Sequence, residues 1–276
     1  MRNCQNLKVS RAIKSEKELR DFFAELAETF GEDVPPTHIF NYDETNLTDD
    51  PGSQRCVFKR GVHYPERVMN SSKTSTSIMF CGSAAGRLLP NYVVYKAKQM
   101  FRQWVTGGPP QTRYNRSISG WFDSCCFEDW FEQLFIPQTR HLQGKKFLIG
   151  DNLSTHFNLH VLKLAKENNI AFICLPANAT HLMQPLDIAF FAPLKRTWRS
   201  ILDHWKRSTS LRQTITKDAF PSLLSTLQDR LYRDGYSENL KSGFAGSGIF
   251  PLNPERVIRK LPGQFRDQRP ENQVTI

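Results

Sequence analysis

The hydrophobic and polar positions along the chain follow two spacings, one helical and one typical of short strands. Leucines and phenylalanines at helical spacing predict a helix over residues 15–30, which Ser15 and Glu18 open as a capping box and Gly31 ends. Short apolar runs between polar segments predict strands at 38–42, 75–83, 88–95, 147–149 and 171–175. Further helical patterns cover 123–135, where Pro137 is expected to end the helix, and 158–166, 194–205 and 220–231.

The order of these elements predicts the fold class. Three strands come first, the second and third as a hairpin, and after an irregular stretch over 99–120 helices alternate with the remaining two strands. This is the plan of a ribonuclease-H-like α/β fold, a mixed five-stranded sheet flanked by helices. We expect residues 34–205 to form this core, between an N-terminal helical linker (1–33) and a C-terminal helical extension (206–262). Residues 263–276 are expected to be a disordered tail.

Composition and charge limit the classes of partner that we expect. The formal net charge of +10 favours polyanions, and nucleic acid first, because basic side chains release counterions from phosphates. No window resembles a membrane span and the polar N-terminus does not read as a signal peptide, so no membrane partner is expected. The six cysteines lack zinc-site spacing and are expected to be reduced thiols, with Cys81 and Cys174 buried in apolar runs.

Three aspartates follow the ends of apolar runs. The first and fourth strands are neighbours in the predicted sheet, so Asp43 and Asp151 are expected side by side, and Asp187 opens the last helix at the same edge. Carboxylate oxygens are the ligands that Mg²⁺ prefers. Three of them can hold two Mg²⁺ or Mn²⁺ ions about 3.5 to 4 Å apart, the arrangement that cleaves or transfers phosphodiesters. The sequence therefore predicts Asp43, Asp151 and Asp187 as metal ligands and catalytic residues, with no small-molecule substrate.

Each of these acids also has an ordinary structural interpretation. An aspartate at a strand end is commonly a turn former or a helix N-cap. Glu44, Asp49 and Asp50 are expected to be solvated loop residues. His156 stands near a helix start, where a capping or core role is favoured over contact with a substrate.

A basic helix behind Asp187 is the candidate nucleic-acid surface. Lys195, Arg196 and Arg199 lie opposite an apolar stripe, and Lys206 is among the further basic residues of this segment. His181 precedes Asp187 closely enough for a loop contact to phosphate. The alternatives are an ordinary solvated face for the helix and a core or capping role for His181.

Three sequence blocks resemble a known family. FNYDETNL, IGDNLSTH and LPANATHLMQPLDIAFFAPLKRTW are similar to the signature blocks of the DDE superfamily endonuclease domain of pogo, Tigger and jerky-like transposases and centromere protein B relatives. The later GSGIFPLNP resembles the end of that family's C-terminal helical extension, and the resemblance covers about residues 15–260. It implies a ribonuclease-H-like core in which Asp43, Asp151 and Asp187 use Mg²⁺ to cut DNA and join it to a target. A nuclear location and a homo-oligomer on DNA are expected with it.

Two departures from the family pattern matter for function. Family members generally carry N-terminal helix-turn-helix modules, for which the residues before the first strand leave no room, and Asn46 stands where many relatives have glycine. A DNA endonuclease or transposase core is therefore the leading hypothesis, and a domesticated DNA- or chromatin-binding protein that does not cut is the second. A ribonuclease or exonuclease of the same fold is a third, which the transposase-like third block disfavours.

Overall fold

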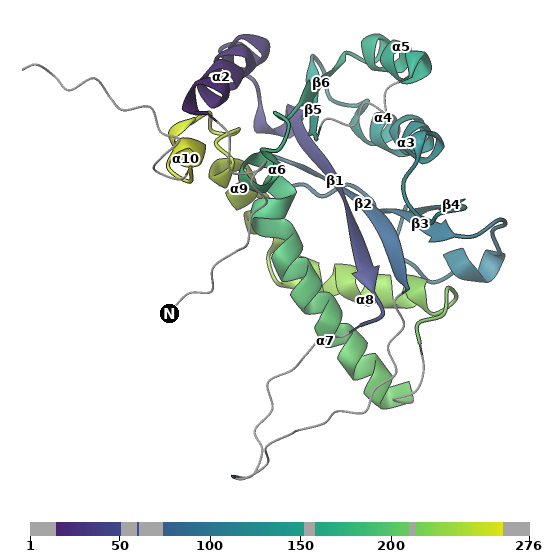
Figure 1. The fold of residues 1–276 in the computed structure, drawn as a ribbon. Helices are drawn as coiled ribbons and strands as arrows, with labels where there is room; N and C mark the ends of the chain where they lie inside the picture. The colour runs from purple at the N-terminus through teal and green to yellow at the C-terminus, as the bar shows by residue number, and fades with distance from the viewer. Residues whose placement is uncertain (1–14, 51–59, 61–73, 152–157, 210–213, 262–276) are drawn as a thin grey trace, which may run out of the picture.

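The computed structural model of the chain describes residues 15–50, 60, 74–151, 158–209 and 214–261 (Figure 1). Its centre is a six-stranded mixed sheet with the strand order β4-β3-β2-β1-β5-β6. The strands are β1 (Ile39–Thr48), β2 (Ser75–Ser83), β3 (Tyr92–Lys96), β4 (Arg113–Ser117), β5 (Lys146–Gly150) and β6 (Ile170–Cys174). The expected α/β class and the element order are confirmed.

Strand β1 is central because it pairs on both sides. It runs antiparallel to β2 from Phe40 to Thr48 and parallel to β5 from Ile39 to Asn41. The expected neighbourhood of the first and fourth predicted strands, now β1 and β5, is thus confirmed, as is the antiparallel pairing of β2 with β3. Strand β1 is longer than its apolar run predicts, because polar residues up to Thr48 continue the ladder with β2.

The sixth strand, β4, corrects the prediction of five strands and an irregular stretch over 99–120. It pairs parallel with β3 at the edge of the sheet. Its sequence, RYNRS, does not alternate apolar and polar residues. Its arginine and asparagine side chains bind polar partners and do not pack in a core. Only the tertiary contacts reveal it as a strand.

Helices cover both faces of the sheet (Figure 1). One face carries α3 (Ser124–Trp130), the π-helical turn η3 (Phe131–Phe135), α4 (Ile136–Thr139) and α5 (Leu159–Glu167), and the other carries α7 (Phe191–Thr209) and α8 (Phe220–Arg233). A third apolar cluster joins α2 (Glu16–Phe30), α6 (Thr180–Met183), α9 (Tyr236–Gly246) and α10 (Glu255–Ile258). The remaining short elements are η1 (Pro36–His38), η2 (Arg102–Val105) and the π-helical turn η4 (Leu186–Phe190).

The helical predictions hold with one correction. Ser15 and Glu18 form the expected capping box of α2, and the apolar stripe of α7 is buried at Leu194 and Trp198. The helix through 123–135 does not stop at Pro137. The N–H of Ile136 donates to the carbonyl of Phe131 across the π-helical turn, and α4 then runs from Ile136 to Thr139 with Pro137 in its first turn, where the missing N–H of proline is tolerated.

The domain boundaries proposed from the sequence stay predictions. Helix α7 runs across position 205, and α8 shares its apolar cluster with the sheet. The expected tail, 263–276, and His156 lie outside the described residues. No helix in the described parts of the chain is long and apolar enough to cross a bilayer. Cys81 is buried as expected, whereas Cys174 is exposed because it ends the edge strand β6.

Candidate active site

The paired strands β1 and β5 bring Asp43 and Asp151 to the same level of the sheet. Their parallel ladder pairs Asn41 with Ile149, and each aspartate lies two residues beyond its member of this pair, Asp43 after Asn41 and Asp151 after Ile149. Side chains two residues apart point to the same face of a strand. Asp43 and Asp151 are both half-buried here, one within β1 and one directly after β5. The sheet therefore brings together two of the three predicted acids.

Asp187 comes to this place from the third sequence block. It is an exposed residue of η4, the turn that leads into α7. The neighbouring backbone is fixed to β1 because the N–H of Leu186 donates to Asn41 Oδ1 over 3.1 Å. The turn that leads into α7 is thereby held beside the strand that carries Asp43.

Two buried amide side chains link the three acid-bearing segments. Asn41 Nδ2 donates to Gln184 Oε1 over 3.0 Å and to the carbonyl of Ile149 on β5 over 2.9 Å. Gln184 Nε2 donates to the carbonyl of Tyr42 over 3.0 Å, and both amide side chains have no exposed surface. We call Asn41 and Gln184 the amide clamp. The sequence analysis missed it, although a polar residue within each acid-bearing block was a signal for it.

The acids influence one another electrostatically. The pKa of Asp43 is raised well above its ordinary value by burial and then by the negative charges of Asp187 and Asp151, against the opposing effect of Gln184. Burial also raises the pKa of Asp151. The structure thus gathers all three predicted acids within electrostatic range. Across the residues that it describes, it does not draw three acidic, histidine or cysteine side chains into a group that could hold a metal.

Glu44 corrects the expectation of a solvated loop residue. It belongs to β1 and is half-buried. Burial and the charge of Asp151 raise its pKa to about 7, although a hydrogen bond from the backbone of Phe122 opposes the shift. Glu44 is therefore a fourth carboxyl group, close to Asp151, which the strand-end pattern did not identify.

Asp49 and Lys206 correct two further expectations. Asp49 is 2% exposed, and Lys206, expected on the basic surface of the helix, is fully buried. Their charged groups are 2.9 Å apart, and Lys206 Nζ also donates to the carbonyl of Asp49 over 2.8 Å. This pair fastens α7 to the end of β1 and leaves Lys206 no direct role in binding a polyanion. Asp50 is exposed, as expected.

The other candidate contacts for nucleic acid have mixed surroundings. Arg196 and Arg199 are exposed on α7, while Lys195 is half-buried with its ammonium 5.6 Å from the centre of the Phe191 ring. His181 is half-buried in α6. The arginines can reach a ligand directly, and a contact by His181 stays a prediction.

Asn46, the departure from the family pattern, has a structural role. Its Oδ1 accepts a hydrogen bond from Ser77 Oγ on β2 over 2.9 Å. The asparagine thus supports the same strand pair that carries Asp43, so the substitution is accommodated within the sheet.

The six-stranded mixed sheet with helices on both faces has the fold of solved transposase complexes. The structure aligns with 92% of its length on a pre-cleavage Mos1 transpososome, at a TM-score of 0.56 and 14% identity, and covers 63% of that chain. The Mos1 paired-end complex with Mn gives a TM-score of 0.55 at 14% identity, over 91% of this chain and 62% of that chain. The paired-end complex with Mg gives a TM-score of 0.55 at 12% identity, over 93% of this chain and 65% of that chain.

The chain belongs to the DDE superfamily endonuclease family, whose family model matches residues 72–226, more than half of its length. Asp151 and Asp187 lie within the matched range and Asp43 lies before it.

Two relatives with similar sequences are longer than this chain and share only part of their length with it. Tigger transposable element-derived protein 7 of Homo sapiens is 23% identical over 182 residues, which are 61% of this chain and 32% of that protein. A protein of Cochliobolus lunatus named MFS-type transporter clz9 is 29% identical over 205 residues, or 71% of this chain and 21% of that protein. The chain therefore spans less than a third of the length of these curated relatives.

Proposed function

We propose that this domain cleaves DNA phosphodiesters and transfers the cut strand, with Asp43, Asp151 and Asp187 holding two divalent ions. The observation that carries the proposal is the gathering of these acids from three distant segments, where the charges of Asp187 and Asp151 raise the pKa of Asp43. Like charges at one place favour the binding of cations. The similarity to transposase complexes that contain Mn or Mg supports the same proposal.

The residues present fit Mg²⁺ or Mn²⁺ in donor type, because carboxylate oxygens are hard ligands. Asp43, on the central strand, would hold the ions together with Asp151 and Asp187. Bound divalent ions would supply Lewis acidity toward the phosphate and activation of the attacking oxygen. The amide clamp would hold the segments of these ligands in place, since Asn41 and Gln184 bridge β1, β5 and the chain before η4.

The test is the nicking of supercoiled plasmid by the purified protein with Mg²⁺, Mn²⁺ or EDTA. We expect metal-dependent nicking that Asp43→Ala, Asp151→Ala and Asp187→Ala each abolish, with circular dichroism unchanged. Asp50→Asn is the matched control, because Asp50 is an exposed acid close in sequence to Asp43 but outside the cluster. Full activity in any of the three cluster variants would refute the assignment. An RNA/DNA hybrid in parallel tests the ribonuclease alternative.

DNA is the proposed partner and α7 the proposed contact surface. Reversing the charges of Lys195, Arg196 and Arg199 removes contacts with phosphates, so we expect weaker binding of duplex DNA and a salt dependence whose log–log slope falls by about 2 to 3. Charge reversal at Lys163 and Lys166, exposed on α5, is the control. An unchanged slope in the α7 variant would exclude this surface. A homo-oligomer on the DNA and a nuclear location belong to the same proposal, and sedimentation with DNA and imaging of a fluorescent fusion test them.

The second candidate function is DNA or chromatin binding without cleavage. It is favoured by the likeness to a protein described as derived from a transposable element. Binding that persists without any metal-dependent nicking, and that Asp151→Asn leaves unchanged, would support this candidate.

A further inference from the structure

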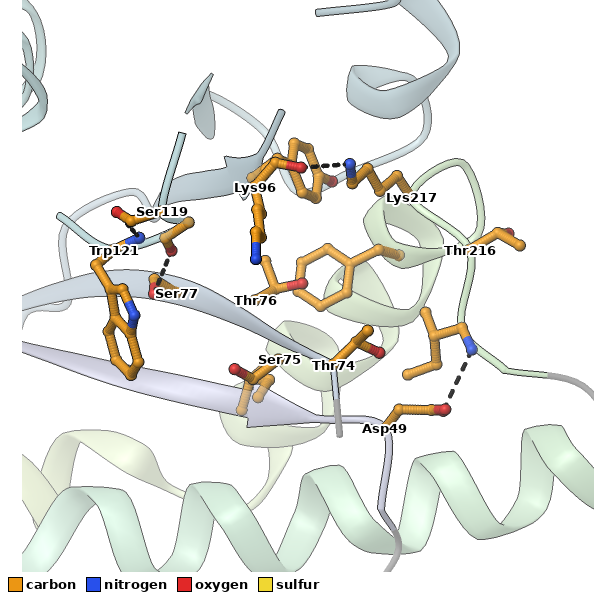
Figure 2. Close-up of a pocket in the computed structure, with 15 residues that line it drawn as sticks. Asp49, Thr74, Ser75, Thr76, Ser77, Lys96, Ser119, Trp121, Thr216 and Lys217 are labelled. Atoms are coloured by element: carbon orange, nitrogen blue, oxygen red, sulfur yellow. Dashed lines mark hydrogen bonds between the residues drawn. The ribbon is translucent and has the colours of Figure 1, made fainter. Parts of the chain in front are cut away.

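A pocket of about 480 Å³ opens at the end of β1, the strand that carries Asp43 (Figure 2). It lies where β1 and β3 end and where β2 and α8 begin. Hydroxyl side chains of β2, from Thr74 to Ser77, form one wall, and Phe220 contributes apolar surface. This volume lies in the range of small-molecule sites, which combine apolar surface with a few polar groups.

An exposed tryptophan stands at one end of this pocket, opposite Thr216 (Figure 2). The side chain of Trp121 is 57% exposed, although its backbone is held on both sides. Ser117 Oγ donates to the carbonyl of Trp121 over 2.7 Å, and the N–H of Trp121 donates to Ser119 Oγ over 3.2 Å. Gly120, with a φ of +83°, packs so closely on Lys96 that a Cβ would lie 2.7 Å from the Cβ of Lys96. The indole is thus presented to solvent by an ordered loop.

The charge of the pocket is positive. Lys96 is exposed and points toward Thr76 in Figure 2. Lys217 donates to the carbonyl of Lys96 over 2.6 Å and lies 4.4 Å from the centre of the Trp104 ring. The acid in the lining, Asp49, is neutralised by the buried Lys206. The lining therefore suits an anion with an aromatic part.

The loop that presents Trp121 is hydrogen-bonded to both β1 and β2. The backbone of Phe122, next to Trp121, donates to the carboxyl group of Glu44, which follows Asp43 on β1, and Ser77 Oγ on β2 donates to the carbonyl of Gly120 over 2.8 Å. Leu47, in the pocket lining, follows Asp43 by four residues on β1, a separation of about 13 Å along a strand. One DNA strand can therefore reach both places.

We infer that this pocket binds an unpaired deoxynucleotide of the DNA strand, whose base stacks on Trp121 while its phosphate contacts Lys96. The inference rests on the proposed function for its choice of DNA as the ligand. A tryptophan face accepts any base, and basic side chains follow the backbone, so the site would favour single-stranded ends without reading their sequence. An unpaired nucleotide held here would set the position of the strand relative to the acid cluster.

The test uses the full chain carrying Asp151→Asn, in EDTA, so that binding is measured without cleavage. Fluorescence anisotropy with a labelled 12-nucleotide oligo-dT and with a blunt duplex gives the two affinities. We expect Trp121→Ala to weaken oligo-dT binding on the order of tenfold with little change for the duplex, and Trp121→Phe to restore most of it. Lys96→Ala should lower the salt slope for oligo-dT by about 0.7.

Tyr232→Ala is the matched control, because Tyr232 is an aromatic residue of α8 with a similar exposed fraction, 53%, that does not line this pocket. Quenching of tryptophan fluorescence by oligo-dT should be smaller in Trp121→Phe than in the parent. Equal binding of oligo-dT by the parent and Trp121→Ala would overturn the inference, even if the unmodified protein nicks plasmid. Conversely, the protein could fail to nick plasmid and still bind oligo-dT with an affinity that depends on Trp121. That result would refute the proposed cleavage and leave the pocket assignment in place.

Discussion

The Asp129 carboxylate and the Asp43 carboxylate lie against the same sheet in opposite electrostatic surroundings. Asp129 receives two hydrogen bonds from the Arg113 guanidinium, over 2.7 and 2.6 Å, and one from the Tyr92 hydroxyl over 2.6 Å. Burial alone would raise its pKa, but these bonds outweigh burial and lower it. Around Asp43, burial and the charges of Asp187 and Asp151 act in the same direction and raise the pKa well above its usual range.

The difference separates acids that the chain pairs with a cation from Asp43, whose acidic neighbours raise its pKa. Asp129 joins β3 and β4 to α3, and Asp49 joins β1 to α7 through Lys206. In both cases the chain supplies the compensating cation. At Asp43 the charges that raise the pKa, those of Asp187 and Asp151, are negative.

The largest effect on stability is expected from breaking the buried ion pair of Lys206 with Asp49. Lys206→Ala leaves Asp49 buried without its cation, and we expect the free energy of unfolding to fall by about 3–5 kcal/mol, measured with urea. Arg207→Ala is the control, because it removes a partly exposed ion pair with Asp203. It should change the free energy of unfolding by less than about 1 kcal/mol. Equal losses would show that burial of the pair is unimportant.

Divalent ions should stabilise the folded protein by binding to the three proposed ligands, Asp43, Asp151 and Asp187. At a Mn²⁺ concentration 100-fold above the dissociation constant, binding to the folded state adds about 2.7 kcal/mol, which a thermal unfolding series detects. Asp43→Asn should abolish this gain. The same variant should be more stable than the parent in EDTA at pH 7, because a carboxyl group whose folded pKa is raised loses stability as the pH rises through that pKa. Asp129→Asn, the control, should keep the response to Mn²⁺.

The amide clamp should contribute both to the free energy of unfolding and to the position of the proposed metal ligands. Gln184→Ala removes the buried partner of Asn41 and of the Tyr42 carbonyl, and we expect a loss of about 1–3 kcal/mol in urea unfolding. Gln228→Ala is the matched control, because it breaks a side-chain amide pair with Asn91, of 2.9 Å, outside the acid cluster. If the clamp positions the metal ligands, Gln184→Ala reduces the stabilisation by Mn²⁺ and Gln228→Ala does not. An undiminished Mn²⁺ response would limit the clamp to a structural role.

The smallest expected effect concerns pH. Because the folded pKa of Asp129 is lowered, its contribution is present above the ordinary value of 3.8 and is lost as the pH falls through the folded pKa. The difference in unfolding free energy between the parent and Asp129→Asn should be about 1 kcal/mol near pH 6, since the pair with Arg113 is partly exposed. It should shrink below pH 3.8. A constant difference over this range would show that the pair does not titrate with folding.

The sequence by itself determined the order of the elements and the three acids. Apolar periodicity marked most strands and helices, and the pairing of the strands that carry Asp43 and Asp151 followed from that order. These features are local or follow from the general plan of the fold, so they can be predicted without contacts. Their gathering near one another was predicted too, whereas their role in metal binding and catalysis stays a prediction.

Only the tertiary structure decided which polar residues are buried and with whom. Strand β4, the amide clamp and the pair of Asp49 with Lys206 depend on partners far away in sequence, such as Gln184 for Asn41. Hydrophobic patterning assigns a polar residue to the surface by default, since burial is affordable only when a hydrogen bond or an opposite charge compensates it. The compensating group is a property of the fold, which is why the sequence placed Glu44 and Lys206 in solvent, whereas the structure half-buries Glu44 and fully buries Lys206.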